Sequence, residues 1–358
     1  MRLPLLLFLP WGNFIVCAML VLAVAPAMAA QPIANEVTFE GAGQVKLSGT
    51  LLLPHAAAAS EPAAARFPAA LLIQGSGPTD RDGSQPPALK IDLLKQLAEH
   101  LAAHGVATLR FDKRGQYRSG AAPKDQAALV EFVAWDNYVD DVVAAMRALQ
   151  QQPQIDPARV ALVGHSEGGL LVMHACKRVQ EKAGEPAAVV LLSTPGRPID
   201  VVLRDQLERI LTAQGATPDQ KKFFLDKNDA IASAIRQTGV VPTDVPPGLQ
   251  ALYPAYLGKF WQGQLKSAPA DLATALEPPV LIIQGDRDQQ EAPGDAAALA
   301  EAINRGRKGK TPAELVVIRG ASHNLKAAKE ETDPGIKGPV VPEALKAISD
   351  WMISAPRR

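Results

Sequence analysis

Six short, mostly apolar runs, each leading directly into a turn-rich segment, restrict the fold of this chain more than any other feature of its sequence. The runs are too short for typical helices, and Gly, Ser, Pro or Asp follows most of them. Continuous apolar stretches bounded by turns are typical of strands buried on both faces of a parallel sheet. The runs are Ala69–Gln74, Val106–Phe111, Val160–Val163, Ala188–Leu192, Val280–Gln284 and Leu315–Ile318.

Segments with apolar residues at helical spacing lie between the runs. Leu93, Leu97 and Leu101, for example, fall on one face of a helix. An earlier segment, Val45–Leu53, alternates like a strand. Because strand, turn and helix follow one another repeatedly, we predict an α/β fold with a doubly wound, mostly parallel sheet. The predicted helices are Leu89–Ala103, Tyr138–Leu149, Glu167–Val179, Ala296–Asn304 and Glu343–Met352.

The alternation of strands and helices stops between residues 197 and 276. Apolar positions in this stretch follow helical spacing, and the remainder is polar. We predict a helical cap inserted between two strands of the sheet, and a long crossover connection is the alternative. The expected organisation is a core in two parts, residues 30–196 and 277–358, with the cap at 197–276.

The first 29 residues have the features of a signal peptide. Arg2 precedes a long apolar stretch, and small residues at Ala27 and Ala29 match the pattern before a cleavage site. We therefore predict cleavage between Ala29 and Ala30 and an exported protein, periplasmic or secreted. An uncleaved membrane anchor is the alternative. No second long apolar run follows, so no stable membrane insertion of the mature chain is expected.

The charge balance and the cysteine count exclude several classes of protein. The chain carries 37 Lys and Arg against 37 Asp and Glu, so no excess positive charge is available to hold phosphates. A nucleic-acid partner is therefore not expected. Cleavage would leave Cys176 alone, which rules out an intramolecular disulfide. No cluster of Cys and His has metal-ligand spacing, and no metal is predicted.

The third apolar run leads into Gly164-His165-Ser166-Glu167-Gly168-Gly169. This is the G-x-S-x-G pattern, in which a serine occupies a sharp turn between a strand and a helix. Side chains two positions to either side of the serine would meet neighbouring backbone, so Gly164 and Gly168 are needed there. We predict that Ser166 is a nucleophile. A glycine-rich turn without chemistry is the alternative reading.

A serine nucleophile needs a general base. Of the six histidines, His323 alone follows the last apolar run, within Gly320-Ala321-Ser322-His323-Asn324. A loop at the carboxyl end of the final strand can bring an imidazole over the serine. We predict that His323 is the base.

The base needs a carboxylate to orient it. The run Val280–Gln284 ends in Gly285-Asp286-Arg287-Asp288, which offers two candidates. We favour Asp288, which lies past the turn. Asp286 lies within the turn, and capping of the loop is the structural role expected of it.

Charge that develops on a substrate carbonyl needs two N–H donors. One is expected to be the amide of Glu167, directly after the nucleophile. The other is expected from the loop Gln74-Gly75-Ser76-Gly77-Pro78, whose glycines permit a close approach. We predict the amide of Ser76, with that of Gly77 as the alternative.

These motifs, in this order, resemble the α/β-hydrolase superfamily, and more narrowly the bacterial serine hydrolases described as esterases or as dipeptidyl-peptidase-like. The family order of nucleophile, acid and base matches the order here. One departure lies at Gln116–Ser119. Relatives carry a further glycine here, and in this chain Tyr117 or Arg118 stands in the place of that glycine. The motifs that carry the resemblance are Gly75–Gly83, Arg110–Gly115, Gly164–Gly169, Gly285–Asp288 and Gly320–His323.

The resemblance implies an α/β-hydrolase fold and the cleavage of small carboxylic esters, with short to medium acyl groups, through an acyl-enzyme and without a cofactor. A peptidase or aminopeptidase, a thioesterase and a lactone hydrolase remain alternatives on the same three residues. A non-catalytic binding protein on this fold is a further alternative. Aromatic residues of the cap either line an apolar pocket or attach the cap to the core: Phe223, Phe224, Tyr253, Tyr256, Phe260 and Trp261.

Overall fold

The computed structural model describes residues 31–55, 66–307, 309–330 and 333–354. The predicted signal peptide lies outside them, so its cleavage stays a prediction. Within the described residues, no helix is long and apolar enough to cross a membrane.

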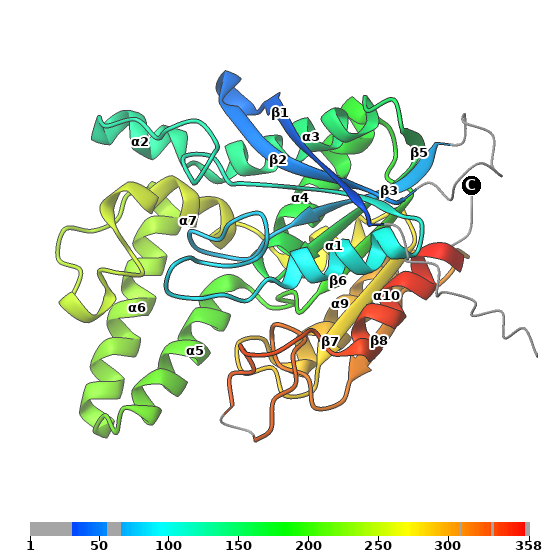
Figure 1. The fold of residues 1–358 in the computed structure, drawn as a ribbon. Coiled ribbons are helices and arrows are strands. Elements are labelled where there is room, and N and C mark those ends of the chain that lie inside the picture. Colours follow the sequence, from blue (N-terminus) through cyan, green and yellow to red (C-terminus); the bar gives the residue numbers. More distant parts are fainter. Residues whose placement is uncertain (1–30, 56–65, 308, 331–332, 355–358) are drawn as a thin grey trace, which may run out of the picture. The chain divides into compact units, whose positions relative to one another are not determined.

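An eight-stranded sheet runs through the described part of the chain, in the order β1-β2-β4-β3-β5-β6-β7-β8 (Figure 1). The strands from β3 to β8 are parallel, whereas β2 pairs antiparallel with both β1 and β4. The strands are β1 (Ile33–Glu40), β2 (Lys46–Leu53), β3 (Phe67–Ile73), β4 (Ala107–Phe111), β5 (Ile155–His165), β6 (Ala188–Leu192), β7 (Val280–Gly285) and β8 (Glu314–Ile318).

All six apolar runs form strands, and the alternating segment forms β2. Sequence analysis missed β1, which leaves most of its side chains exposed and therefore lacks a continuous apolar run. It also missed the early part of β5, where two exposed positions, Pro157 and Ala158, interrupt the apolar pattern. Strands β4, β6 and β7 are buried along their whole length, as expected of strands covered on both faces.

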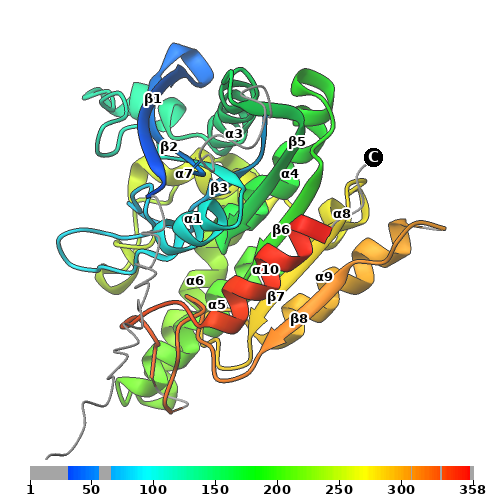
Figure 2. The same cartoon turned by 45° about the vertical axis from the view of Figure 1, so that its right-hand side comes forward.

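Helices cover the sheet on both faces, which confirms the doubly wound arrangement. Helices α1 and α10 lie on the near face in Figure 2, and their apolar side chains pack in one core cluster. Those of α3, α4 and α9 pack in a second cluster. These helices are α1 (Leu93–Ala103), α3 (Trp135–Gln150), α4 (Glu167–Ala183), α9 (Pro293–Gly306) and α10 (Pro342–Ser354).

The segment between β6 and β7 is helical, with α5 (Ile199–Ala213), α6 (Pro218–Thr238), α7 (Gly258–Leu265) and α8 (Pro269–Thr274). Helix α6 begins at a capping box formed by Thr217 and Gln220 and ends before Gly239, whose φ of 71° closes the helix. Figure 1 shows α5 and α6 side by side, with α7 next to α2 (Gln126–Phe132), a short helix that sequence analysis did not predict. The exact domain boundaries stay predictions.

Candidate active site

Ser166 occupies a strained turn between β5 and α4. Its φ of 55° and ψ of −124° lie outside the regions that side chains ordinarily adopt. The glycines on either side have the steric role expected of them. A Cβ on Gly164 would lie 2.3 Å from the carbonyl oxygen of Gly168, and one on Gly168 would lie 2.4 Å from that of Ile73. Two backbone segments therefore pass each other at the serine, and only glycine permits the approach.

We expect Gly168→Ala to destabilise the fold by about 1–3 kcal/mol, because the new methyl group would meet rigid backbone. Gly294→Ala in α9 is the matched control, since a Cβ there meets no atom within 4 Å. Alanine is the better helix former, so the control is expected to be stabilised by about 0.5 kcal/mol. Urea unfolding of both variants measures the difference. Equal stability of the two would contradict the crowded turn.

Asp288 and His323 are in direct contact. The Nδ1 atom of His323 lies 2.9 Å and 3.1 Å from the two carboxylate oxygens of Asp288. Both side chains are almost completely buried. Because a carboxylate only accepts, Nδ1 carries the proton and donates it to Asp288. The Nε2 atom of the neutral imidazole is then free to accept a proton, as a general base must.

Several groups hold Asp288 in place. Oδ1 accepts hydrogen bonds from the amides of Gln290 (2.8 Å) and Glu291 (2.9 Å), and Oδ2 accepts one from Nε2 of Gln284 (2.9 Å). Burial alone would raise the pKa of Asp288, but the charge and hydrogen bond of His323 together with the two amides bring the pKa below its usual value. The carboxylate therefore stays ionised beside the imidazole. Sequence analysis missed Gln284, and its polarity at the end of an apolar run was the available signal.

Asp286 has a structural role, but its side chain bonds to another loop and not to its own turn as expected. Its Oδ1 accepts a hydrogen bond of 2.6 Å from the amide of Gly320, at the start of the loop that carries His323. Asp286 thus ties the loop after β7 to the loop after β8, whereas Asp288 contacts the imidazole.

His165 contacts the candidate base, which sequence analysis did not predict. Its Nε2 lies 2.9 Å from the carbonyl oxygen of His323, and the two rings are 4.8 Å apart between centroids. Burial, with a contribution from His323, lowers the pKa of His165 to about 3. The ring is therefore neutral at ordinary pH, and its Nε2–H donates to the His323 carbonyl. This bond fixes the backbone that carries the imidazole.

The loop after β3 lies against the serine turn. A Cβ on Gly75 would be 3.3 Å from the Cβ of Ser166 and 3.2 Å from Nδ1 of His165. In the part of the chain that the structure describes, the amides of Ser76 and Glu167 donate to no protein acceptor. Both predicted donors are therefore available to a bound group. The Ser166 hydroxyl likewise makes no hydrogen bond to any described residue.

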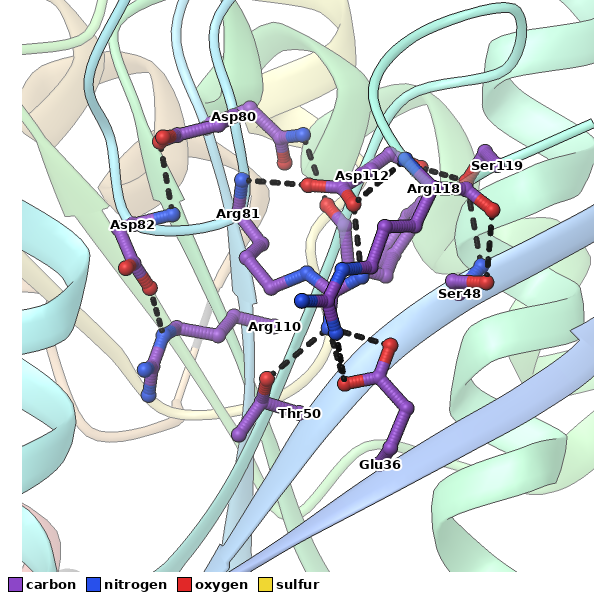
Figure 3. A network of polar contacts seen from close by, with 12 residues as sticks. Glu36, Ser48, Thr50, Asp80, Arg81, Asp82, Arg110, Asp112, Arg118 and Ser119 are labelled. Carbon is purple, nitrogen blue, oxygen red and sulfur yellow. Dashed lines mark hydrogen bonds and ion pairs between the residues drawn. The ribbon is translucent and has the colours of Figure 1, made fainter. Parts of the chain in front are cut away.

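A network of ion pairs braces the continuation of this loop (Figure 3). Arg81 donates to Asp112 (2.7 Å) and to Glu36 on β1 (2.8 Å). Arg110 on β4 pairs with Asp82 at 2.8 Å. Arg81, Arg110 and Asp112 are buried, so these charges are paired within the protein and shielded from solvent. The network attaches the loop to β1 and β4 and thereby holds its preceding turn beside Ser166.

The departure at Tyr117 preserves the tight turn. Tyr117 has a φ of 47°, a left-handed conformation that glycine adopts more readily. The turn is closed by a hydrogen bond of 3.0 Å from the Gly115 amide to the Gly120 carbonyl. The Tyr117 hydroxyl donates to the Pro78 carbonyl at 2.6 Å. Tyrosine therefore adds a link to the loop that carries Ser76.

Three of the six cap aromatics are buried, and one of them attaches the cap to the core. Tyr253, Phe260 and Trp261 are buried. Phe260 packs edge-on against Trp135 and Tyr138 of α3, with ring centroids 5.4 Å and 5.5 Å apart. These contacts join α7 to the core of the fold.

Three features lie at the carboxyl ends of parallel strands: a strained serine turn, a paired aspartate and histidine, and two available amides, one in the loop after β3 and one at the start of α4. This combination of fold and site defines the class of α/β hydrolases. The model of the alpha/beta hydrolase family matches residues 87–328, and the chain belongs to that family.

The individual relatives share less than a quarter of their aligned residues with this chain. The chain is 24% identical over 290 residues to Esterase EstD of Thermotoga maritima, an alignment that covers 80% of this chain and 62% of the relative. The Pyrococcus furiosus esterase Pf2001 aligns with a TM-score of 0.56 at 16% identity, over 91% of this chain and 92% of the other. A puromycin-hydrolyzing peptidase of Mycobacterium tuberculosis aligns with the same TM-score at 19% identity, over 93% and 42%. The two structures share the fold with this chain.

Proposed function

We propose that this protein is a serine hydrolase that cleaves small carboxylic esters with short to medium acyl groups. The contact between Asp288 and His323, on the loops beside a strained serine turn, is the observation that carries the proposal. The similarity to a named esterase favours an ester over other acyl compounds.

In the proposed reaction, Nε2 of His323 removes the proton from Ser166, and the serine oxygen attacks the ester carbonyl. The amides of Ser76 and Glu167 stabilise the negative charge that develops on the carbonyl oxygen. His323 then gives its proton to the departing alcohol, and an acyl-enzyme remains on Ser166. Water, activated by the same imidazole, releases the acid. Asp288 holds the imidazole in its Nδ1–H form and stabilises its positive state. None of these steps involves a cofactor.

A comparison of leaving groups tests the substrate class. We expect p-nitrophenyl esters of acetate, butyrate and hexanoate to be hydrolysed with kcat/KM at least about 100-fold above that of alanyl p-nitroanilide. A matched thioester and a lactone, measured beside the esters, test the thioesterase and lactone-hydrolase alternatives. The opposite order, with the anilide preferred, would replace the esterase by an aminopeptidase on the same site.

A further inference from the structure

Lys113 directly follows β4 and Asp112, and its ammonium group is buried between the serine turn and the loop after β3. Its Nζ lies 2.7 Å from the carbonyl oxygen of Gly75, 3.3 Å from that of Gly77 and 2.9 Å from Oε1 of Glu167. An ammonium group has three donors, so each has one acceptor here. The three acceptors thus fix the position of the Lys113 side chain, and the side chain in turn holds the two loop carbonyls and the Glu167 carboxylate in place.

The bond to Gly75 determines where the amide of Ser76 points. The Gly75 carbonyl and the Ser76 N–H belong to one peptide group, which is planar and trans, so the two bonds point in opposite directions. With the carbonyl held at 2.7 Å by Lys113, the N–H is directed away from the ammonium group. Gly75 is also the loop residue whose added Cβ would lie against Ser166.

The partner of Lys113 belongs to the other side of the same site. Glu167 carries the second available amide, directly after Ser166, and its side chain is buried. Its Oε2 accepts a hydrogen bond of 3.3 Å from Nε2 of Gln264 on α7. A buried ammonium group is costly unless it is paired, and Glu167 supplies the pairing charge. Lys113 therefore links the peptide group that carries the Ser76 amide to Glu167, the residue that carries the second amide.

We propose that Lys113 is a positioning residue for the oxyanion hole: it holds the Gly75 carbonyl and so orients the Ser76 amide toward the charge that develops on the substrate. The inference rests on the proposed function. The predicted consequence is confined to the transition state, because a neutral ester carbonyl gains less from the two amides than an oxyanion does.

The test is Lys113→Met, which keeps most of the length of the side chain and removes its three donors. We expect kcat for p-nitrophenyl butyrate to fall by about 10²-fold, as on removal of one oxyanion donor, while KM changes by less than about threefold. The affinity for a trifluoromethyl ketone, which forms a charged tetrahedral adduct, should fall in parallel with kcat/KM. An unchanged kcat, or a loss confined to KM, would overturn the proposal.

Lys113→Met also leaves Glu167 buried without its partner, so stability must be separated from catalysis. Lys113→Met is therefore repeated in a Glu167→Gln background, where neither charge of the pair remains, and the double variant is compared with Glu167→Gln alone, in which Lys113 keeps its two carbonyl acceptors. The proposal predicts that thermal stability returns but the loss of kcat of about 10²-fold persists. If kcat returns to that of Glu167→Gln, Lys113 serves only to neutralise Glu167 and the proposal is wrong.

A failure of the inference about Lys113 can be distinguished from a failure of the proposed hydrolase function. Ser166→Ala tests that function alone. A chain that hydrolyses esters through Ser166 and keeps its kcat in Lys113→Met would retain the proposed function and lose only this inference.

Discussion

Ser166→Ala is expected to lower kcat for p-nitrophenyl butyrate by about 10⁶-fold, the loss typical of removing the nucleophile of a serine hydrolase. The fold should be unaffected. The Ser166 hydroxyl makes no hydrogen bond to the described residues, so its removal leaves no buried partner unsatisfied. The free energy of unfolding in urea should therefore change by less than about 0.5 kcal/mol. The initial rate of nitrophenol release, measured beside the unfolding curve, checks both statements.

The paired measurement distinguishes chemistry from structure. A variant that keeps both its stability and more than about one hundredth of the activity would exclude Ser166 as the nucleophile. A variant that loses activity and stability together would instead assign the serine to the fold.

Asp288→Asn is expected to lower kcat by about 10⁴-fold. The asparagine amide would meet Nδ1 of His323 with a donor in place of an acceptor, which favours the tautomer that protonates Nε2. A protonated Nε2 cannot remove the proton from Ser166. Asparagine is almost isosteric with aspartate, so the hydrogen bonds from the Gln290 and Glu291 amides can persist on the remaining oxygen. The loss should therefore appear in kcat more than in KM.

Asp286→Asn is the matched control, two residues earlier on the same loop. Asp286 accepts a hydrogen bond from the Gly320 amide but has no hydrogen bond to the imidazole among the described residues. The asparagine oxygen can accept the same bond, so we expect a loss of less than about tenfold. Steady-state kinetics of both variants decide between the two carboxylates. If Asp286→Asn caused the larger loss, the assignment of the acid would be wrong.

The sheet could be predicted because burial leaves a direct trace in the sequence. Strands covered on both faces need continuous apolar runs, and each such run here forms a strand. The edge strand β1 left no such trace, since most of its side chains are exposed. Helix α2 also escaped prediction, because none of its residues is buried and no apolar face marks it.

The positions of Ser166, Asp288 and His323 could be predicted because each follows a strand at the same edge of the sheet. Their roles are now supported by the contact between Asp288 and His323 and by the strained turn at Ser166. The groups that hold these residues could not be predicted. Lys113 and His165 act through contacts between segments far apart in the sequence, and no local spacing indicates such contacts. Gln284 contacts Asp288 four residues later, and only its polarity at the end of an apolar run marked it.

The contacts that hold the loop carrying Ser76 also could not be predicted from local spacing. Its glycines predicted a close approach, but the polar residues that follow it could equally have been exposed. Only the folded chain places Arg81 between Glu36 on β1 and Asp112, which directly follows β4 (Figure 3). The loop after β3 is thus held from two directions, by this network and by Lys113.

If Ser166 is a nucleophile activated by His323, it should react with a fluorophosphonate, because this reagent requires an activated serine. Intact-mass measurement and peptide analysis after the reaction locate the adduct. We expect one adduct per chain, located on Ser166, absent from Ser166→Ala and formed far more slowly in His323→Ala. An unlabelled protein, or an adduct on another residue, would show that Ser166 is not the activated nucleophile.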